Sequence, residues 1–253
     1  MIPTGSSNGN ANELCGNGDI ETAALYIITG CRTFKNIASI SQGGKHLGFW
    51  EVILGHGFWS DIMGVIEDRR LGWFRYTLAG LVTFLRSRSE FNIRIDYLPY
   101  DPPTDGGDVD KSNAETEPVW KTIEGRYTGL MSFPTLVRPQ KNTPKCVFDV
   151  NAEAMTLLME KQCGRLTFLS YMNKLTQLHT DTFSYDFVTT LQVKSFRLRV
   201  LPTEGATERE KRLERTVSLD GELHKVESGD LDITVKLHRN LLEMFGAGTI
   251  AEE

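Results

Sequence analysis

A stretch rich in glycine and aromatic residues, followed by two arginines, is the part of this sequence whose residue types could do chemistry. Residues 55–61 read Gly-His-Gly-Phe-Trp-Ser-Asp, and Arg69 and Arg75 follow, six residues apart. Glycine lets the backbone approach another group closely, and the guanidinium fork of arginine matches an anion with several oxygens. With the aromatic pair Phe58 and Trp59 and the carboxylate of Asp61, this composition predicts a site that handles a phosphate beside an apolar group.

The N-terminal segment offers a second group of phosphate donors. Ile-Pro-Thr at residues 2–4 leads into Gly5, Ser6 and Ser7. Backbone N–H groups and serine hydroxyls can all donate, so a loop of this composition suits contact with a phosphate or a ribose. A flexible terminus is the alternative interpretation, and residue types alone do not separate the two.

Helices are expected beside both segments. Residues 19–30 begin with Asp19, a favoured N-cap residue, and end at Gly30, which suits the left-handed position after a helix. A helix also follows the arginines, because apolar residues recur there at helical spacing, and we expect this stripe to face a core while Arg75 lies on another face. The stripe consists of Phe74, Leu78, Leu81 and Leu85. Residues 165–178 predict a further helix with one apolar face.

Strands are predicted for most of the remaining chain. Apolar and polar residues alternate over 91–98 and again over 231–238, and residues 32–54 form a hairpin pattern that turns at Gln42–Lys45. The alternation after residue 187 shifts by one position, which predicts a bulge near Lys194 and Ser195. So many strands at roughly ten-residue spacing favour an antiparallel two-layer β domain with helices at its rim.

Composition excludes several classes of protein. With 253 residues, of which 40% are hydrophobic and 24% charged, the chain suits a globular protein, and no apolar run is long enough for a transmembrane helix. The net charge of −5 argues against nucleic-acid binding. The four cysteines and five histidines show no zinc-ligand spacing, and their pattern predicts free thiols in a reducing, intracellular compartment.

Six segments together give the chain a recognisable pattern. They occur in the order found in the superfamily of sphingosine, ceramide and diacylglycerol kinases, and the chain resembles the ceramide kinases most closely. The segments extend over nearly the whole chain, at residues 2–8, 19–25, 57–61, 70–76, 95–99 and 220–222.

The resemblance implies transfer of the γ-phosphate of ATP to the primary hydroxyl of ceramide, with ATP and Mg²⁺ as cofactors and a cytoplasmic location with peripheral membrane contact. It implies a mainly β fold with helices. Residues 1–30 would be a remnant of an α/β nucleotide-binding lobe, and residues 31–253 a β-sandwich lobe that receives the lipid. That lobe would carry an acidic loop at 99–118 and a charged loop at 202–215, and its C-terminal strand would return to the first lobe.

The resemblance also assigns roles to individual residues. The groups expected to contact the nucleotide and its phosphates are Gly5, Ser6, Ser7, Arg69, Arg75, Asp220 and Glu222. Asp220 and Glu222 would also lie near Mg²⁺, directly or through water, because carboxylate oxygens suit this ion. The residues that match the polar-head region of the lipid pocket are Phe58, Trp59, Asp61 and Met63.

One departure from the superfamily pattern concerns the lipid head group. Met63 stands where sphingosine kinases carry an aspartate that pairs with the substrate ammonium, unless the alignment slips there by one residue. A buried carboxylate without a cationic partner would be costly, so the uncharged amide of ceramide is favoured over sphingosine.

A second departure concerns the catalytic base. In the superfamily, the proposed general-base aspartate belongs to a Gly-Gly-Asp-Gly segment that precedes the one beginning here at Ile2. The resemblance therefore places the general base upstream of Met1, and no catalytic residue is assigned within the chain. A non-catalytic lipid- or partner-binding remnant is the alternative function, a sphingosine kinase the second, and a β-sandwich interaction domain the third.

Overall fold

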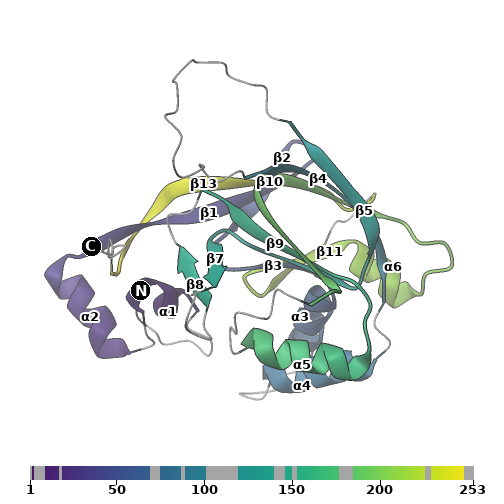
Figure 1. Ribbon diagram of the computed structural model, residues 1–253, viewed down its shortest axis with the longest axis horizontal. Coiled ribbons are helices and arrows are strands. Elements are labelled where there is room, and N and C mark those ends of the chain that lie inside the picture. The colour runs from purple at the N-terminus through teal and green to yellow at the C-terminus, as the bar shows by residue number, and fades with distance from the viewer. Residues whose placement is uncertain are drawn as a thin grey trace.

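The computed structural model describes residues 2, 9–16, 19–68, 75–86, 89–100, 119–139, 146–149, 153–176, 185–225 and 229–247. Within them the fold is mainly antiparallel β with helices, as the sequence predicts (Figure 1). The helices are α1 (Gly9–Cys15), α2 (Ile20–Thr29), α3 (Phe58–Asp68), α4 (Arg75–Leu85), α5 (Arg165–Thr176) and α6 (Glu208–Glu214). None of these helices is long and apolar enough to cross a membrane.

Eleven of the described strands form one curled sheet. They are β1 (Arg32–Gln42), β2 (Lys45–Trp50), β3 (Leu54–Gly57), β4 (Phe91–Pro99), β5 (Lys121–Tyr127), β6 (Gly129–Phe133), β9 (Met155–Glu160), β10 (Val188–Leu201), β11 (Thr216–Leu219), β12 (Glu222–Lys225) and β13 (Asp232–Phe245). Their main order is β12-β11-β3-β6-β9-β10-β13-β1-β2, and β4 joins β10 and β5. The strands β7 (Leu136–Pro139) and β8 (Cys146–Asp149) pair with each other.

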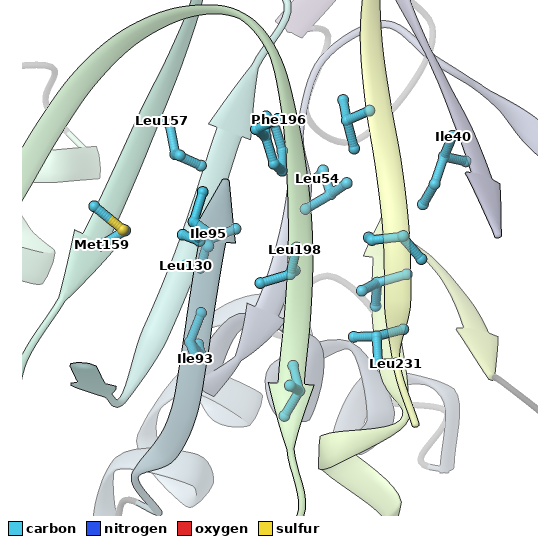
Figure 2. Packing of buried hydrophobic residues seen from close by; sticks show 14 of the residues in the cluster. Ile40, Leu54, Ile93, Ile95, Leu130, Leu157, Met159, Phe196, Leu198 and Leu231 are labelled. Carbon is cyan, nitrogen blue, oxygen red and sulfur yellow. The ribbon is translucent and has the colours of Figure 1, made fainter. Parts of the chain in front are cut away.

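The main core lies inside the curl of this sheet. Leu54 on β3, Leu130 on β6 and Leu198 on β10 belong to one buried cluster although their strands are not all neighbours in the sheet (Figure 2). Strands from both ends of the sheet therefore meet around one apolar interior. Burial of this surface, worth roughly 25 cal/mol per Å² of apolar area, is what favours the curled sheet over a flat one.

A second cluster fills the space between the outer face of the sheet and the helices α3, α4 and α5, which lie together in Figure 1. Side chains alternate along a strand, so Met131 and Leu158 point to this cluster while Leu130 and Leu157 point into the curl. Every residue of β9 is consequently buried. This is the reason that Leu157, Leu158 and Met159 follow one another in β9 without polar alternation.

Several local predictions are confirmed. Asp19 caps α2 by accepting from the backbone N–H of Thr22, and Gly30 ends that helix with a positive φ of 70°. Gly43 and Gly44, both at positive φ, form the two-residue turn between β1 and β2. The pairing of β10 with β4 shifts register between Val193 and Ser195, at the predicted bulge.

The predicted inward face of α4 is wrong. Leu78, Leu81 and Leu85 are 38%, 50% and 63% exposed. The helix packs instead through the face that holds the fully buried Ala79 and the buried Thr83. A small residue at position 79 lets α4 approach α3 closely. The sequence pattern shows only the stripe of leucines and does not indicate that the face with Ala79 packs more closely. On α5, Leu166 and Leu169 are exposed as well, and Phe168 and Tyr171 face the second cluster.

The segment 202–215 is not simply a charged loop. Residues 208–214 form α6, which begins with a capping box in which the side chains and backbones of Thr207 and Glu210 bond reciprocally. The sequence signal for this helix is the pattern Thr-x-x-Glu at residues 207–210. The acidic segment at residues 101–118, in contrast, lies outside the described residues.

The N-terminal helices pack against the end of the last strand. Leu14 and Cys15 of α1, Ala23 of α2 and Met244 of β13 share a small apolar cluster. The backbone N–H of Ala247 donates to the carbonyl of Leu14. The assignment of residues 1–30 to a separate lobe remains a prediction, and these contacts place the C-terminal strand beside that segment.

Gly57 is expected to tolerate no side chain. Its φ is 67°, and a Cβ there would lie 2.6 Å from the carbonyl oxygen of Thr128. Gly57→Ala should therefore lower the free energy of unfolding by about 2 kcal/mol, through left-handed strain plus a backbone clash. Gly43→Ala is the matched control, since Gly43 has a φ of 55° with no atom near its Cβ position, and should cost about 1 kcal/mol. If urea denaturation showed the same loss of unfolding free energy in both variants, the predicted clash with Thr128 would be wrong.

Candidate functional site

Gly55 and Gly57, in the segment 55–61, lie close to neighbouring strands of the protein itself. A Cβ on Gly55 would lie 2.7 Å from Oγ of Ser218 on β11, and one on Gly57 would strike Thr128 beside β6. Both glycines belong to β3, which pairs with β11 on one side and β6 on the other. The sequence analysis predicts that these glycines allow a close approach to a phosphate. In the structure they allow β3 to pack closely against its neighbouring strands, directly before α3 begins.

His56, between these glycines, is a buried neutral histidine. Its side chain is fully buried, and Nδ1 donates to the carbonyl oxygen of Thr216 at 2.9 Å. Burial lowers the pKa of His56 to about 4, and the hydrogen bond to Thr216 offsets this only in part. The imidazole ring also meets Phe91 edge to face, with centroids 5.3 Å apart. His56 therefore acts as a core residue of β3.

Four residues are predicted to bind the lipid, and three of them point toward the second cluster. Phe58, Trp59 and Met63 all contact it from α3, and the Phe58 ring meets Phe168 of α5 edge to face at 4.9 Å. The spacing of these residues along α3 explains the shared direction, because positions 59 and 63 lie one turn apart. The start of α3 thus packs aromatic and thioether side chains against the residues of α4 and α5 in the second cluster.

Asp61 contacts a different group. Its side chain is 2% exposed, and its Oδ2 accepts from Nη2 of Arg209 on α6, with a second, longer contact of 3.4 Å from Nε to Oδ1. A buried carboxylate needs such a partner, since an unpaired charge in the interior is costly. The pair fastens α6 to the first turn of α3. Sequence reasoning missed Arg209, although the capping box that starts α6 could have placed it on a helix.

Asp220 clamps the chain that leads into β3. It occupies the turn between β11 and β12 at a φ of 49°. Its carboxylate accepts from the backbone N–H groups of Glu51, Val52 and Ile53 at 2.7, 2.8 and 2.9 Å. Charge-assisted hydrogen bonds of this kind are roughly twice as strong as neutral ones. Glu222, two residues later, begins β12 and is exposed.

A partly buried polar network connects Asp220 and the loop at 51–53 to α1. Glu51 accepts from Nδ2 of Asn10 at 2.7 Å, and the side-chain carbonyl of Asn10 accepts from Nζ of Lys35. Lys35 is fully buried on β1 and also bonds Glu13 at 2.7 Å. Burial raises the pKa of Glu13 above its usual range, and Lys35 offsets part of that rise. Sequence reasoning missed Lys35, because nothing in a strand pattern marks a lysine as buried.

β3 is the element that brings these groups together. The loop at 51–53, held by Asp220 and tied to α1, enters the strand, and α3 leaves it. A four-residue strand spans roughly 13 Å, so the Asp-Gly-Glu turn and the start of α3 lie at that order of separation.

Several of the predicted nucleotide residues cannot be placed around this strand. Outside the described residues lie Met1, Gly5, Ser6, Ser7 and Arg69, as does the side chain of Arg75, the first residue of α4. Their positions relative to Asp220 are therefore not described, and their roles stay predictions. The placement of the general base upstream of Met1 likewise stays a prediction.

The fit of a metal ion to this region can be judged from its carboxylates. Within the described ranges no group of three or more His, Cys, Asp or Glu side chains could hold one. Both oxygens of Asp220 already accept backbone hydrogen bonds. Mg²⁺ commonly uses one or two carboxylates together with substrate phosphates, and an exposed Glu222 fits the single-carboxylate arrangement.

Comparison with known proteins points to one family. Residues 78–253 match the family described as the ceramide kinase C-terminal domain. The human ceramide kinase-like protein is 25% identical over 267 residues, which cover 97% of this chain and 46% of that protein. Human ceramide kinase is 25% identical over 230 residues, which cover 78% of this chain and 42% of that protein. The chain thus spans less than half the length of these relatives.

Solved structures share the fold. A diacylglycerol kinase from Bacillus anthracis superposes with a TM-score of 0.56 at 17% identity, covering 97% of this chain and 67% of that one. At this identity the likeness concerns the fold alone. It agrees with the mainly β architecture and the curled sheet described above.

Proposed function

The chain belongs to the ceramide kinase family, and from that premise we propose that it is the lipid-receiving part of a lipid kinase that transfers the γ-phosphate of ATP to the primary hydroxyl of ceramide. Its family is one of lipid kinases. The specific substrate and the transfer itself are our proposal, because the chain spans less than half of its curated relatives.

The nucleotide end of the proposed site is assigned to the residues that the resemblance to the superfamily identifies. Gly5, Ser6 and Ser7 donate to the phosphates, and Arg69 and Arg75 neutralise them. Glu222 would hold Mg²⁺, which would reduce the negative charge of the ATP phosphates. Asp220 positions the loop at 51–53 rather than the metal, since its oxygens are taken by backbone N–H groups.

The lipid end is assigned to α3. Phe58, Trp59 and Met63 supply the apolar wall for the sphingolipid head, and Asp61 with Arg209 forms a polar edge behind it. The uncharged side chain of Met63 suits the neutral amide of ceramide. A carboxylate at position 63 would have no cationic partner beside such an amide, and burying it unpaired would be costly.

One observation carries the proposal. Asp220 binds the chain at the entrance of β3 and α3 begins at the exit, so one short strand separates Asp220, one of the predicted nucleotide residues, from the predicted lipid residues on α3. A phosphoryl transfer needs both substrates positioned together, because positioning supplies most of what a protein contributes to this reaction.

The test measures transfer of labelled phosphate from ATP to ceramide in the presence of Mg²⁺, by this sequence joined to an upstream segment that supplies the Gly-Gly-Asp-Gly motif. We expect Arg75→Ala to lower transfer about tenfold or more, since a charge-assisted contact to phosphate is worth about 1.5 to 3 kcal/mol. Arg86→Ala, which removes the same side chain just beyond the other end of α4, is the control and should leave transfer unchanged. An equal response of the two variants would contradict the phosphate assignment.

A lipid-binding protein without transfer is the second candidate. The observation that favours it is that both oxygens of the Asp220 carboxylate accept backbone hydrogen bonds, three in all. Binding of the chain to ceramide-containing vesicles with no labelled product in the transfer assay would support this candidate. Absence of both binding and transfer would reject both functions.

A further inference from the structure

A groove of about 500 Å³ lies on the outer face of the curled sheet, where β10 runs between β4 and β13. Leu98, Ser195 and Lys236 form one row across these strands, since Ser195 pairs with both of the others. The residues at positions 97, 196 and 235 contact the main core, so the row itself faces outward. In Figure 1, β4 and β13 lie on the opposite side of the molecule from α3, α4 and α5. The groove is therefore separate from the predicted lipid residues on α3.

Positive charge gathers in this groove. Three of the side chains that line it are cationic, namely Lys194, Lys236 and Arg239. Glu153 is the one carboxylate among the described lining residues, and its Oε1 lies 2.6 Å from Nη1 of Arg239. Neither lysine forms an ion pair with any residue in the described ranges. Because the whole chain carries a net charge of −5, the groove is a local reversal of sign that attracts anions.

Two irregularities of the sheet direct these cations. The pairing of β10 with β4 shifts register at residue 194, so Lys194 is an extra residue in its strand. The pairing of β1 with β13 shifts at residue 36, and Arg239 lies in the corresponding bulge of β13. Asn240, beside it, has a φ of 50°, and its backbone N–H donates to the side chain of the buried Asn36 at 3.0 Å. Bulges often re-aim side chains beside functional sites, and here each of them carries a cation that lines the groove.

The rest of the wall is largely apolar. Trp120 directly precedes β5, whose first residue pairs with position 97, so it lies beside Leu98. Its side chain is 48% exposed, which leaves an indole face available for stacking. Leu237 adds a further apolar contact. The groove volume falls within the range of roughly 300 to 1,000 Å³ that is typical of small-molecule sites. A ligand that fits this wall carries an apolar or planar group beside its negative charge.

We propose that this groove is a second ligand site, which binds a phosphate monoester with an apolar or planar substituent. Lys194 and Lys236 bind the phosphate, and Trp120 covers the substituent. A phosphate monoester carries about two negative charges and three acceptor oxygens at pH 7, so it matches several separate cations better than a carboxylate does. A lipid phosphate and a nucleoside monophosphate share this chemistry. The inference goes beyond the proposed function, because none of these residues belongs to the site assigned there.

The test measures binding of this chain to dihexanoyl phosphatidic acid, to adenosine monophosphate and to inorganic phosphate by titration calorimetry. At least one of the two esters should bind more tightly than inorganic phosphate, and the tighter ester identifies a lipid or a nucleotide as the source. Lys194→Gln and Lys236→Gln should each weaken this binding by roughly tenfold, since a charge-assisted contact is lost. Lys45→Gln is the control, because it removes the same charge at an exposed position of β2 that does not line the groove, and it should leave the affinity unchanged.

A further variant tests the apolar wall independently of the lysines. Trp120→Ala should weaken binding of the tighter ester by roughly tenfold, because stacking on the indole is lost, and should leave binding of inorganic phosphate unchanged. Failure of the wild-type chain to bind either ester would overturn the inference. Unchanged affinity in both lysine variants would place the ester elsewhere on the molecule and overturn it as well, as would an equal loss in Lys45→Gln and Lys236→Gln.

Discussion

Lys35→Met is expected to lower the free energy of unfolding by about 3 to 5 kcal/mol, a large part of the stability of a typical domain. The substitution leaves the buried carboxylate of Glu13 without its cation and breaks the link from Asn10 to the rest of the network. Because Glu51 and Asp220 continue this network, the loop at 51–53 should also lose protection from amide hydrogen exchange. Urea denaturation followed by circular dichroism measures the first effect.

Two further variants make the result specific to the buried pair. Lys35→Met combined with Glu13→Leu should recover most of the loss, since an apolar pair of similar volume is well tolerated in place of buried ions. Lys211→Met removes a lysine that pairs with Glu208 at an exposed site and should cost less than about 0.5 kcal/mol. A cost below about 1 kcal/mol for Lys35→Met would show that water reaches the network.

The second large effect is a dependence of stability on pH that originates in His56. Its pKa is about 4 in the folded protein and 6.5 in an unfolded chain. Between these values the unfolded state binds more protons, so stability rises with pH from about 4 to about 6.5 and is then constant with respect to this group. The difference between pH 7 and pH 4 should amount to about 3 kcal/mol.

Comparison of variants isolates the histidine from the acidic residues that titrate in the same range. His56→Gln should flatten the stability profile between pH 4 and 6.5 relative to wild type, although it also lowers stability at pH 7 by removing the bond to Thr216. His46→Gln, at an exposed position of β2, should keep the wild-type slope. An unchanged slope in His56→Gln would mean that the ring becomes protonated without leaving its buried site.

Local features of the fold could be predicted because they depend on neighbours in the sequence. The cap at Asp19, the glycine turn at residues 43 and 44, and the register shift after Val193 each require only the residue types within a few positions. The order of the six motifs likewise indicated the family, because order and spacing are properties of the chain itself.

The buried faces of helices and the contacts between segments far apart in the sequence could not be predicted in the same way. Two helical stripes of α4 are compatible with burial, and the contact with α3 selected the one that holds Ala79 and left Leu81 in solvent. Glycines 55 and 57 signalled a close approach, but only the pairing of β3 with β11 and β6 identifies Ser218 and Thr128 as what they approach.

The sequence by itself determined that this chain is a mainly β member of a lipid kinase family, with its polar motifs in a fixed order. The tertiary structure decided what those motifs touch. Asp220 lies 168 residues from Val52 in sequence, and Glu160 lies 101 residues from Trp59, yet each pair is joined by a hydrogen bond. Such partners are selected by the curl of the sheet and by the need to satisfy every buried polar group, and neither is encoded in local spacing.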